Sequence, residues 1–247
     1  MTDADALRTD KYNGNTSTDL TADLARLSSG EPLAYVIGWV PFLGLRVELD
    51  SRPLIPRPET EWWVEQCISE IGSRDTKERP LRILDLCAGS GAIGLSLLKA
   101  LPFAHMSFAE LSPSHTAQIE KNVQVNHLDA SRATIRSGDV FSAFPTETWD
   151  IILCNPPYIP STRRLESSVV DFEPSEALFA GLDGLDLIRR ISAEVPGHLS
   201  SPGEVWMECD IANIAESAGL LTKAGSEGVE IRTDQYGRPR IVVGYFA

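Results

Sequence analysis

The segment Asn155–Tyr158, which reads Asn-Pro-Pro-Tyr, points most directly to chemistry. It follows the apolar run Trp149–Cys154, so we expect it at the end of a strand. The side-chain oxygen of Asn155 and the carbonyl of Pro156 can accept both N–H bonds of a free amide, while the prolines hold these acceptors still. An amide nitrogen is a poor nucleophile because its lone pair is delocalised, so an enzyme that uses it must position it. An ordinary proline turn would contain the same residue types, and other segments must decide.

A second segment of this kind is Asp85–Gly94, whose glycines stand where a strand must turn sharply into a helix. Glycine there lets a ligand approach the bare backbone. The spacing of Gly89, Gly91 and Gly94 also matches the dinucleotide fingerprint. Asp85 adds a carboxylate that could meet a cationic ligand. A sulfonium compound with an amino group suits this acidic turn better than a pyrophosphate does.

Acidic residues also end the next two expected strands. Glu110 follows Asp85 by 25 residues, and its carboxylate can bind both hydroxyls of a ribose. Asp139 could receive an adenine amino group while Val140 packs on the ring. A solvated strand end and a simple Gly-Asp turn are the structural alternatives. The order of these residues favours a site, because three strands end in acidic residues and the fourth ends in Asn155–Tyr158, all at one edge of a sheet.

Strands and helices alternate through this part of the chain. The expected strands are residues 81–86, 106–111, 133–136, 151–154, 203–209, 229–233 and 240–246. The expected helices are residues 92–101, 114–126 and 211–223. Such alternation predicts right-handed crossovers and a mainly parallel sheet with helices on both faces. A turn at Tyr236–Pro239 favours an antiparallel last strand.

The composition excludes several classes of protein. The 247 residues are 43% hydrophobic, which is typical of a globular domain, and the net charge of −13 disfavours stable binding to nucleic acid, because Lys and Arg supply that affinity. We expect no membrane segment, since no run of about eighteen apolar residues occurs. The acidic start lacks the features of a transit peptide, so we expect a cytoplasmic location, with a mitochondrial one open for a eukaryotic source. Four dispersed cysteines suggest neither zinc nor a disulfide scaffold.

The glycine turn, the acidic strand ends and Asn155–Tyr158 together resemble the class I S-adenosylmethionine-dependent methyltransferases. Further segments make the chain similar to the release-factor glutamine methyltransferase family of the PrmC/HemK type, from about residue 30 to the C-terminus. These segments are Gly30–Gly38 (Gly-Glu-Pro-Leu-Ala-Tyr-Val-Ile-Gly), Leu54–Glu61 (Leu-Ile-Pro-Arg-Pro-Glu-Thr-Glu), Asn155–Pro160 and Glu173–Leu185.

The resemblance implies a Rossmann-like α/β fold with a mainly parallel seven-stranded sheet, an antiparallel last strand and a short N-terminal hairpin and helix appendage. It implies methyl transfer from S-adenosylmethionine to the side-chain amide nitrogen of the glutamine in a Gly-Gly-Gln motif. The substrate would be a class 1 peptide chain release factor, the product S-adenosylhomocysteine, and no metal would be required.

The same resemblance implies the site residues. Those expected to bind the cofactor are Asp85, Cys87, Ala88, Gly89, Ser90, Gly91, Glu110, Leu111, Asp139, Val140 and Asn155. Those expected to hold the glutamine are Asn155, Pro156, Pro157 and Tyr158. Three features depart from the family pattern. Cys-Ala replaces the usual Gly-Thr in the glycine turn, and Glu110 stands where aspartate is common. The larger departure is that only 29 residues precede Gly30, where family members usually carry a helical domain of several helices.

We expect three parts along the chain. Residues 1–30 form a polar, partly disordered N-terminal segment, a reduced helical domain with one helix at about 19–27. Residues 31–75 form a hairpin (40–43 with 45–49) and a linking helix, and a charged connector covers 72–80. Residues 76–247 form the S-adenosylmethionine-binding methyltransferase domain.

Three other functions remain open on the residues alone. An amino-methyltransferase acting on adenine or guanine in nucleic acid could use the same turn, but it would need an electropositive channel. A non-catalytic binding module could keep the fold without the chemistry. An NAD-dependent oxidoreductase would leave the proline turn unexplained.

Overall fold

The computed structural model describes residues 2–74 and 79–247, so the expected connector at 72–80 lies partly outside the described residues. Its main sheet has seven strands in the order β5-β4-β3-β6-β7-β9-β8. Their bounds are β3 Leu81–Leu86, β4 Ala104–Glu110, β5 Ala133–Ser137, β6 Trp149–Cys154, β7 Leu199–Glu208, β8 Gly228–Thr233 and β9 Pro239–Phe246. Strands β3 to β7 pair in parallel, and β9 pairs antiparallel with both β7 and β8. The predicted fold class is confirmed.

The order of the strands creates a switch point. The chain starts in the middle of the sheet at β3, adds β4 and β5 on one side, and then returns to add β6 and β7 on the other side. The connections that leave β3 and β6 therefore diverge at the carboxyl ends of these two neighbouring strands. Ligands of such sheets bind in the crevice outside this point.

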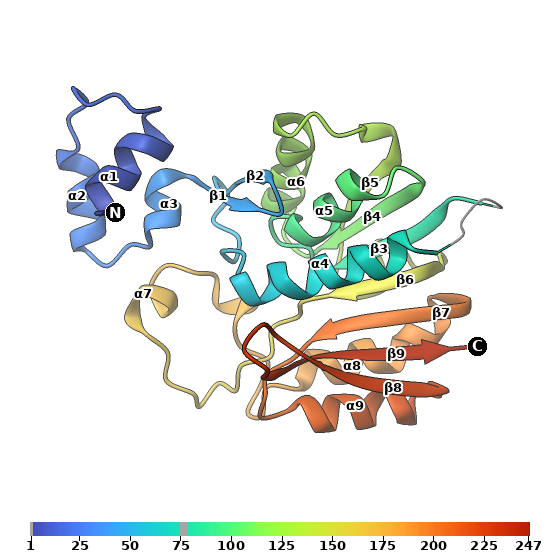
Figure 1. Cartoon of the computed structure of the whole chain (residues 1–247). Helices are drawn as coiled ribbons and strands as arrows, with labels where there is room; N and C mark the ends of the chain where they lie inside the picture. Colours follow the sequence, from blue (N-terminus) through green and yellow to red (C-terminus); the bar gives the residue numbers. More distant parts are fainter. Residues whose placement is uncertain (1, 75–78) are drawn as a thin grey trace.

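Helices cover both faces of the sheet (Figure 1). Their bounds are α4 Pro58–Gly72, α5 Ala92–Ala100, α6 Pro113–Val125, α8 Asp186–Glu194 and α9 Ile214–Lys223. Alternate side chains of β6 enter two separate apolar cores, as the period of a strand requires. Ile151 and Leu153 join the core under α4, α5 and α6, whereas Ile152 and Cys154 join the core under α8 and α9.

Helix α8 has no counterpart among the expected elements. Its apolar residues Ile188 and Ile191, followed by Val195, are fully buried on one side. The charged residues between them face outward, so the helix is short and strongly amphipathic. The spacing of Ile188, Ile191 and Val195 is present in the sequence, but the loop-like residues on both sides of it indicated a loop instead of a helix. Shorter helical turns lie at Ala130–Arg132, Val140–Ala143, Ser167–Val170 (α7), Ser175–Ala177 and Val195–Gly197.

The N-terminal segment contains more helix than expected. The expected helix at 19–27 is α2 (Thr21–Ser28), but α1 (Asp3–Ala6) and a π-helical turn (Leu7–Lys11) precede it, and α3 (Leu33–Ile37) follows. The prediction of a single helix was therefore incomplete. Leu7, Leu20 and Val36 form a small core that joins these helices, and such packing between distant residues outweighs a polar local composition.

The expected hairpin and linking helix are present as β1 (Trp39–Phe42), β2 (Leu45–Glu48) and α4. Asn122 of α6 ties the hairpin to the main domain, because its amide group bonds both the backbone of Glu48 and the carbonyl of Ser90 in the glycine turn. Within the described residues, no helix is long and apolar enough to cross a lipid bilayer.

Candidate active site

Three adjoining cavities lie at the switch point, beyond the carboxyl ends of β3, β4 and β6. Their volumes are about 210 Å³, about 280 Å³ and about 50 Å³. We call them the first, second and third cavities in this order. Asn155 and Leu54 line all three. Asn155 therefore stands where the three spaces meet.

Most of the expected site residues line these cavities. The first is bordered by Cys87, Gly89, Glu110, Leu111, Asp139, Val140, Asn155 and Pro157. The second is bordered by Asn155, Pro156 and Tyr158, and the third by Cys87, Ala88, Gly89, Ser90 and Asn155. Two of the expected site residues, Asp85 and Gly91, line none of the three cavities.

The glycine turn between β3 and α5 has a left-handed backbone, which two glycines adopt without strain. Cys87, Gly89 and Gly91 have φ angles of 60°, 55° and 80°. Apart from Gly89 and its two chain neighbours, no described residue has an atom within 4 Å of the place where Gly89 would carry a Cβ, so its backbone is open to a ligand. A Cβ on Gly94 would lie 2.4 Å from the ring of Phe108, which explains why α5 can pack so closely on the sheet. Gly91 thus lies in the left-handed turn and Gly94 permits the close packing, as expected from their spacing, and the approach of a ligand at Gly89 stays a prediction.

Asp85 supports this turn from behind. Its side chain is fully buried, and the N–H of Gly94 donates to its Oδ2 atom at 2.8 Å. Burial raises the pKa of Asp85 from 3.8 to about 8, the Gly94 hydrogen bond opposes the rise, and the charge of Glu110 adds to it. Because Asp85 does not border the cavities, its position suits fixing the start of α5 rather than touching a cationic ligand.

Glu110 connects the turn to the cavity wall. Its carboxylate, at 8% exposure, accepts the N–H of Gly89 at 2.8 Å and the N–H of Ser112 at 3.0 Å. Each carboxylate oxygen keeps a free acceptor position, because such an oxygen can accept more than one hydrogen bond. Glu110 can therefore accept the two hydroxyls of a ribose while it holds the glycine turn.

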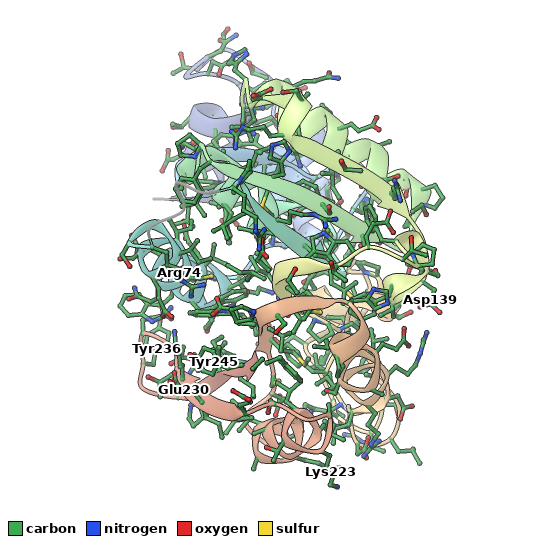
Figure 2. The ribbon with its side chains drawn as sticks, turned by 90° about the vertical axis from the view of Figure 1, so that its right-hand side faces the viewer. Arg74, Asp139, Lys223, Glu230, Tyr236 and Tyr245 are labelled. Carbon is green, nitrogen blue, oxygen red and sulfur yellow. The ribbon has the colours of Figure 1, made fainter. Side chains whose placement is uncertain are left out.

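The far end of the first cavity is built by Gly138–Val140. The Asp139 carboxylate pairs with Arg190 of α8 at 2.8 Å, and both side chains are half-exposed. Asp139 lies on the side of the molecule away from Tyr236 and Glu230 (Figure 2). Val140 has a φ of 51°, a rare value for a β-branched residue, and its side chain is buried. Strain of this kind often marks a binding site. Arg190 was missed by sequence reasoning together with its helix.

Asn155–Tyr158 forms the wall between the first two cavities. The Tyr158 hydroxyl donates to Glu208 at 3.0 Å, and the Asn155 Nδ2 atom donates to the Thr60 hydroxyl at 3.4 Å. Burial, and then the negative charge of Glu208, raise the pKa of Tyr158 well above its usual range. The Tyr158 side chain thus stays neutral and held in place. Sequence reasoning missed Thr60 and Glu208 as residues of the site.

The backbone after the turn is fixed by the segment that follows α7. Ile159 forms a parallel bridge with Phe179, in which the Ile159 N–H donates to the Leu178 carbonyl at 2.9 Å. A Cβ on Gly184 would lie 2.2 Å from the Tyr158 carbonyl, so only glycine fits there. The Gly-Leu-Asp-Gly-Leu part of the sequence pattern therefore has a packing role.

Arg57 and Glu173 join two loops above the second cavity. The Glu173 carboxylate is almost fully buried, pairs with Arg57, and accepts the N–H of Ile55 at 3.0 Å. This holds the proline-rich loop of residues 54–58 over Asn155.

Among the described residues, no group of three or more His, Cys, Asp or Glu side chains is arranged to hold a metal ion.

Comparisons with known proteins agree with this geometry. Residues 73–171 match the methyltransferase small domain family. The chain is 34% identical over 226 residues to the release factor glutamine methyltransferase of Lactococcus lactis subsp. lactis, covering 90% of this chain and 80% of that protein. It is 37% identical over 223 residues to the release factor glutamine methyltransferase of Bordetella pertussis, with the same two shares of 90% and 80%.

Solved structures share the fold. The Thermus thermophilus 16S rRNA N2 G1207 methyltransferase, solved with AdoMet and guanosine, superposes with a TM-score of 0.61 at 17% identity. The match covers 85% of this chain and 50% of that one. At this identity the likeness concerns the fold alone.

Proposed function

The chain belongs to the release factor glutamine methyltransferase family, and from this premise we propose how its three cavities divide the work of the reaction. The protein transfers a methyl group from S-adenosylmethionine to the side-chain amide nitrogen of a glutamine in a peptide chain release factor. We assign the first and third cavities to the cofactor and the second to the glutamine. The carrying observation is that Asn155 borders all three cavities.

The residues of the first and third cavities fit S-adenosylmethionine. The open backbone of Gly89 can be approached by the amino acid part, and the free acceptor positions of Glu110 suit the ribose hydroxyls. Val140 offers an apolar surface to the adenine, and Asp139 an acceptor for its amino group. When bound, the cofactor supplies a methyl carbon made electrophilic by a positive sulfur.

The second cavity suits the glutamine side chain. Pro156 and Tyr158 form its wall, and Leu165 and Val169, from the loop before and within α7, close its other side. We propose that the Asn155 side-chain oxygen and the Pro156 carbonyl accept the two N–H bonds of the glutamine amide. These acceptors sit on a backbone that two prolines and the bridge to Phe179 hold rigid. The amide nitrogen is then aimed at the first cavity.

The chain promotes the reaction by position and by exclusion of water. Asn155 and Pro156 hold the nitrogen in line with the methyl carbon, and the loop held by Arg57 and Glu173 covers the site. The nitrogen becomes positively charged as it takes the methyl group, and this acidic N–H gives its proton to water once the methylated glutamine leaves the covered site. No side chain therefore has to act as a strong base, and the rate depends on alignment.

We propose a class 1 release factor as the partner, with the glutamine of its Gly-Gly-Gln motif as acceptor. This motif can enter as an extended tip, because its two glycines carry no side chains that would collide with the loop at Leu165. We further propose the cytoplasm as the place of action, since release factors act on translating ribosomes. The division of residues 1–30, 31–75 and 76–247 into helical, linking and catalytic parts belongs to the same proposal.

Incubation with methyl-labelled S-adenosylmethionine and a purified release factor tests this function. We expect one added methyl group by mass spectrometry, located on the glutamine of the Gly-Gly-Gln motif. The same factor with that glutamine replaced by alanine should take no label. Label on both forms would move the acceptor elsewhere, and no label on either, with measurable cofactor binding, would refute the substrate.

Asn155→Ala tests the assignment of the amide acceptor. We expect kcat to fall by about 100-fold or more, because the glutamine nitrogen loses its alignment. The dissociation constant for S-adenosylmethionine, measured by calorimetry, should change much less. Equal losses in turnover and in cofactor affinity would contradict a role toward the glutamine.

A further inference from the structure

A buried carboxylate behind the proline turn has no part in the reaction described so far. Glu208, the last residue of β7, is 1% exposed. Its Oε1 atom accepts the Tyr158 hydroxyl at 3.0 Å. Its Oε2 atom accepts the Thr60 hydroxyl at 2.7 Å and the Trp63 indole N–H at 2.8 Å. Three donors from three places in the chain thus converge on one carboxylate.

The direction of these hydrogen bonds follows from the chemistry of the groups. An ionised carboxylate only accepts hydrogen bonds, so the Thr60 hydroxyl must donate its single hydrogen to Glu208. The Thr60 hydroxyl oxygen then has only lone pairs to offer to Asn155, whose Nδ2 atom lies 3.4 Å away, so Thr60 can only accept a hydrogen bond from it. The Asn155 side chain must therefore turn its NH₂ group to Thr60.

This direction decides how Asn155 meets the substrate. The oxygen and nitrogen of an asparagine amide have nearly the same shape, and only their hydrogen-bond partners fix which one points where. With its NH₂ group on Thr60, Asn155 presents its oxygen to the cavities. A glutamine amide offers two N–H donors, so the oxygen is the atom it needs. A flipped Asn155 would place donors against donors.

We propose that Glu208 is a positioning residue that acts through Thr60 to orient the Asn155 amide with its oxygen toward the glutamine. The inference rests on the proposed role of Asn155. Glu208 acts at the same time on Tyr158, whose hydroxyl it holds, so both ends of the Asn155–Tyr158 wall depend on one carboxylate. The distance from Asn155 to Thr60 is long for a hydrogen bond, and such contacts commonly shorten when the substrate binds.

A purely structural role would not require a carboxylate. Burying a charge is costly, and a neutral group could tie β7 to α4 with less loss. What a carboxylate adds is that it never donates, which keeps the Thr60 hydroxyl pointing one way. Glutamine can imitate this, because its oxygen can face Thr60 and Trp63 while its NH₂ group donates to the Tyr158 oxygen. Leucine cannot, since it leaves Thr60 free to donate to Asn155.

The test measures kcat and KM for the release factor, the dissociation constant for S-adenosylmethionine, and the melting temperature of each variant. We expect Thr60→Val and Glu208→Leu to lower kcat by about 10- to 100-fold, as losses of supporting contacts commonly do. The dissociation constant for S-adenosylmethionine should change much less than kcat, because Thr60 borders only the small third cavity and the residues of the first cavity stay intact. Thr60→Ser and Glu208→Gln should restore most of the turnover.

Two controls separate orientation from stability. Ser96→Ala removes a similarly buried hydroxyl that bonds a carbonyl inside α5, and it should leave kcat unchanged even if the melting temperature falls. In the Asn155→Ala background, Thr60→Val should cause no further loss of kcat, because Thr60 acts through Asn155.

Three results would overturn the inference: full turnover by Thr60→Val, an equal loss by Glu208→Gln and Glu208→Leu, or an undiminished effect of Thr60→Val without Asn155. If Glu208→Leu does not fold, the two Thr60 variants still decide the question. Failure of the wild-type protein to methylate the release factor would instead refute the proposed function, so the two failures are distinct.

Discussion

Asp85 shows how one residue can shape a site without touching what binds there. It lies fully buried between β3 and α5, where its Oδ2 atom accepts the Gly94 N–H and its Oδ1 atom has no hydrogen-bond partner among the residues that the structure describes. Burial raises its pKa from 3.8 to about 8, so it is mostly protonated at neutral pH. A neutral acid can hold the start of α5 without adding a second negative charge beside Glu110.

The raised pKa has a consequence for stability. Between pH 3.8 and about 8 the unfolded chain has released this proton while the folded chain keeps it. The free energy of unfolding should therefore fall as the pH rises through this window and become level above about pH 8. Asp85→Asn keeps an oxygen for Gly94 but removes the titration. We expect the free energy of unfolding of the variant to rise relative to that of the wild type as the pH increases, by on the order of a few kcal/mol at pH 8.

Urea unfolding of both proteins from pH 5 to pH 9 checks this expectation. Glu65→Gln, which removes an exposed carboxylate of α4, serves as the matched control and should follow the wild-type curve. Parallel curves for Asp85→Asn and the wild type would show that Asp85 is ionised in the folded protein.

Some residues of the site were visible in the sequence and others were not, for a physical reason. Glu110 is the last residue of β4, whereas Asp139 and Asn155 lie just beyond the ends of β5 and β6, and parallel strands bring their ends to one edge of a sheet. Thr60 and Glu208 are 148 residues apart and carry no local signal. Their meeting depends on how α4 packs against β7, which no periodicity in the sequence records.

At the scale of elements, the sequence predicted regular structure well where the period was strong. The bounds of β3 agree with the expected strand, because four of its six residues are apolar and it lies between a charged connector and the glycine turn. Helix α8 was missed because it contains few apolar residues and is flanked by loop-like segments. The first helical turns were missed because contacts of Leu7 with Leu20 and Val36 stabilise them. The contacts between loops were the least predictable from the sequence, although they fix the residues of the site in place.

Gly184 gives a test of how one loop holds another. Its φ is 79°, and an added Cβ would lie 2.2 Å from the Tyr158 carbonyl. We expect Gly184→Ala to destabilise the protein by about 1–3 kcal/mol, from backbone strain and displacement. Because the added Cβ would displace the backbone of the proline turn at Tyr158, kcat should drop by roughly tenfold or more.

Gly219→Ala is the matched control for this prediction. Gly219 lies inside α9, and apart from its chain neighbours and the nearby backbone of α9 no described residue has an atom within 4 Å of an added Cβ. Alanine should therefore stabilise the helix by up to about 1 kcal/mol. Turnover should not change. Chemical unfolding and methyl-transfer kinetics on both variants give the comparison, and wild-type turnover by Gly184→Ala would show that the loop adapts.

At the scale of the whole molecule, the N-terminal helices are connected to the site by a series of polar contacts. Glu31 is nearly buried and accepts Arg26 at 2.7 Å and also Arg52. The Tyr35 hydroxyl donates to the Pro53 carbonyl at 2.8 Å, just before the loop above Asn155. In Figure 1 these helices and α7 lie on the side away from the C-terminus, which is the side of the carboxyl ends of the parallel strands. A release factor that reaches the second cavity must therefore pass near them.

The charge of the molecule favours a protein substrate over a nucleic-acid substrate. The net charge is −13, and three arginines at or near the cavities have acidic partners: Arg57 pairs with Glu173, Arg163 with Asp210 and Arg190 with Asp139. Arginines that are paired in this way release few counterions from a phosphate backbone. The alternative of an amino-methyltransferase on adenine or guanine requires the opposite arrangement.

We therefore expect no saturable binding of a fluorescent single-stranded RNA that contains unpaired adenines and guanines, measured by anisotropy from about 50 to 200 mM salt. Labelled S-adenosylmethionine should transfer no methyl group to this RNA under conditions where the release factor is methylated. The release factor reaction is the positive control, because it shows that enzyme and cofactor are active. Tight RNA binding that weakens steeply with salt would reveal a basic groove that the paired arginines do not suggest. Methylation of the RNA itself would extend the acceptor from the glutamine amide to the base amino group, whose nitrogen is similarly delocalised.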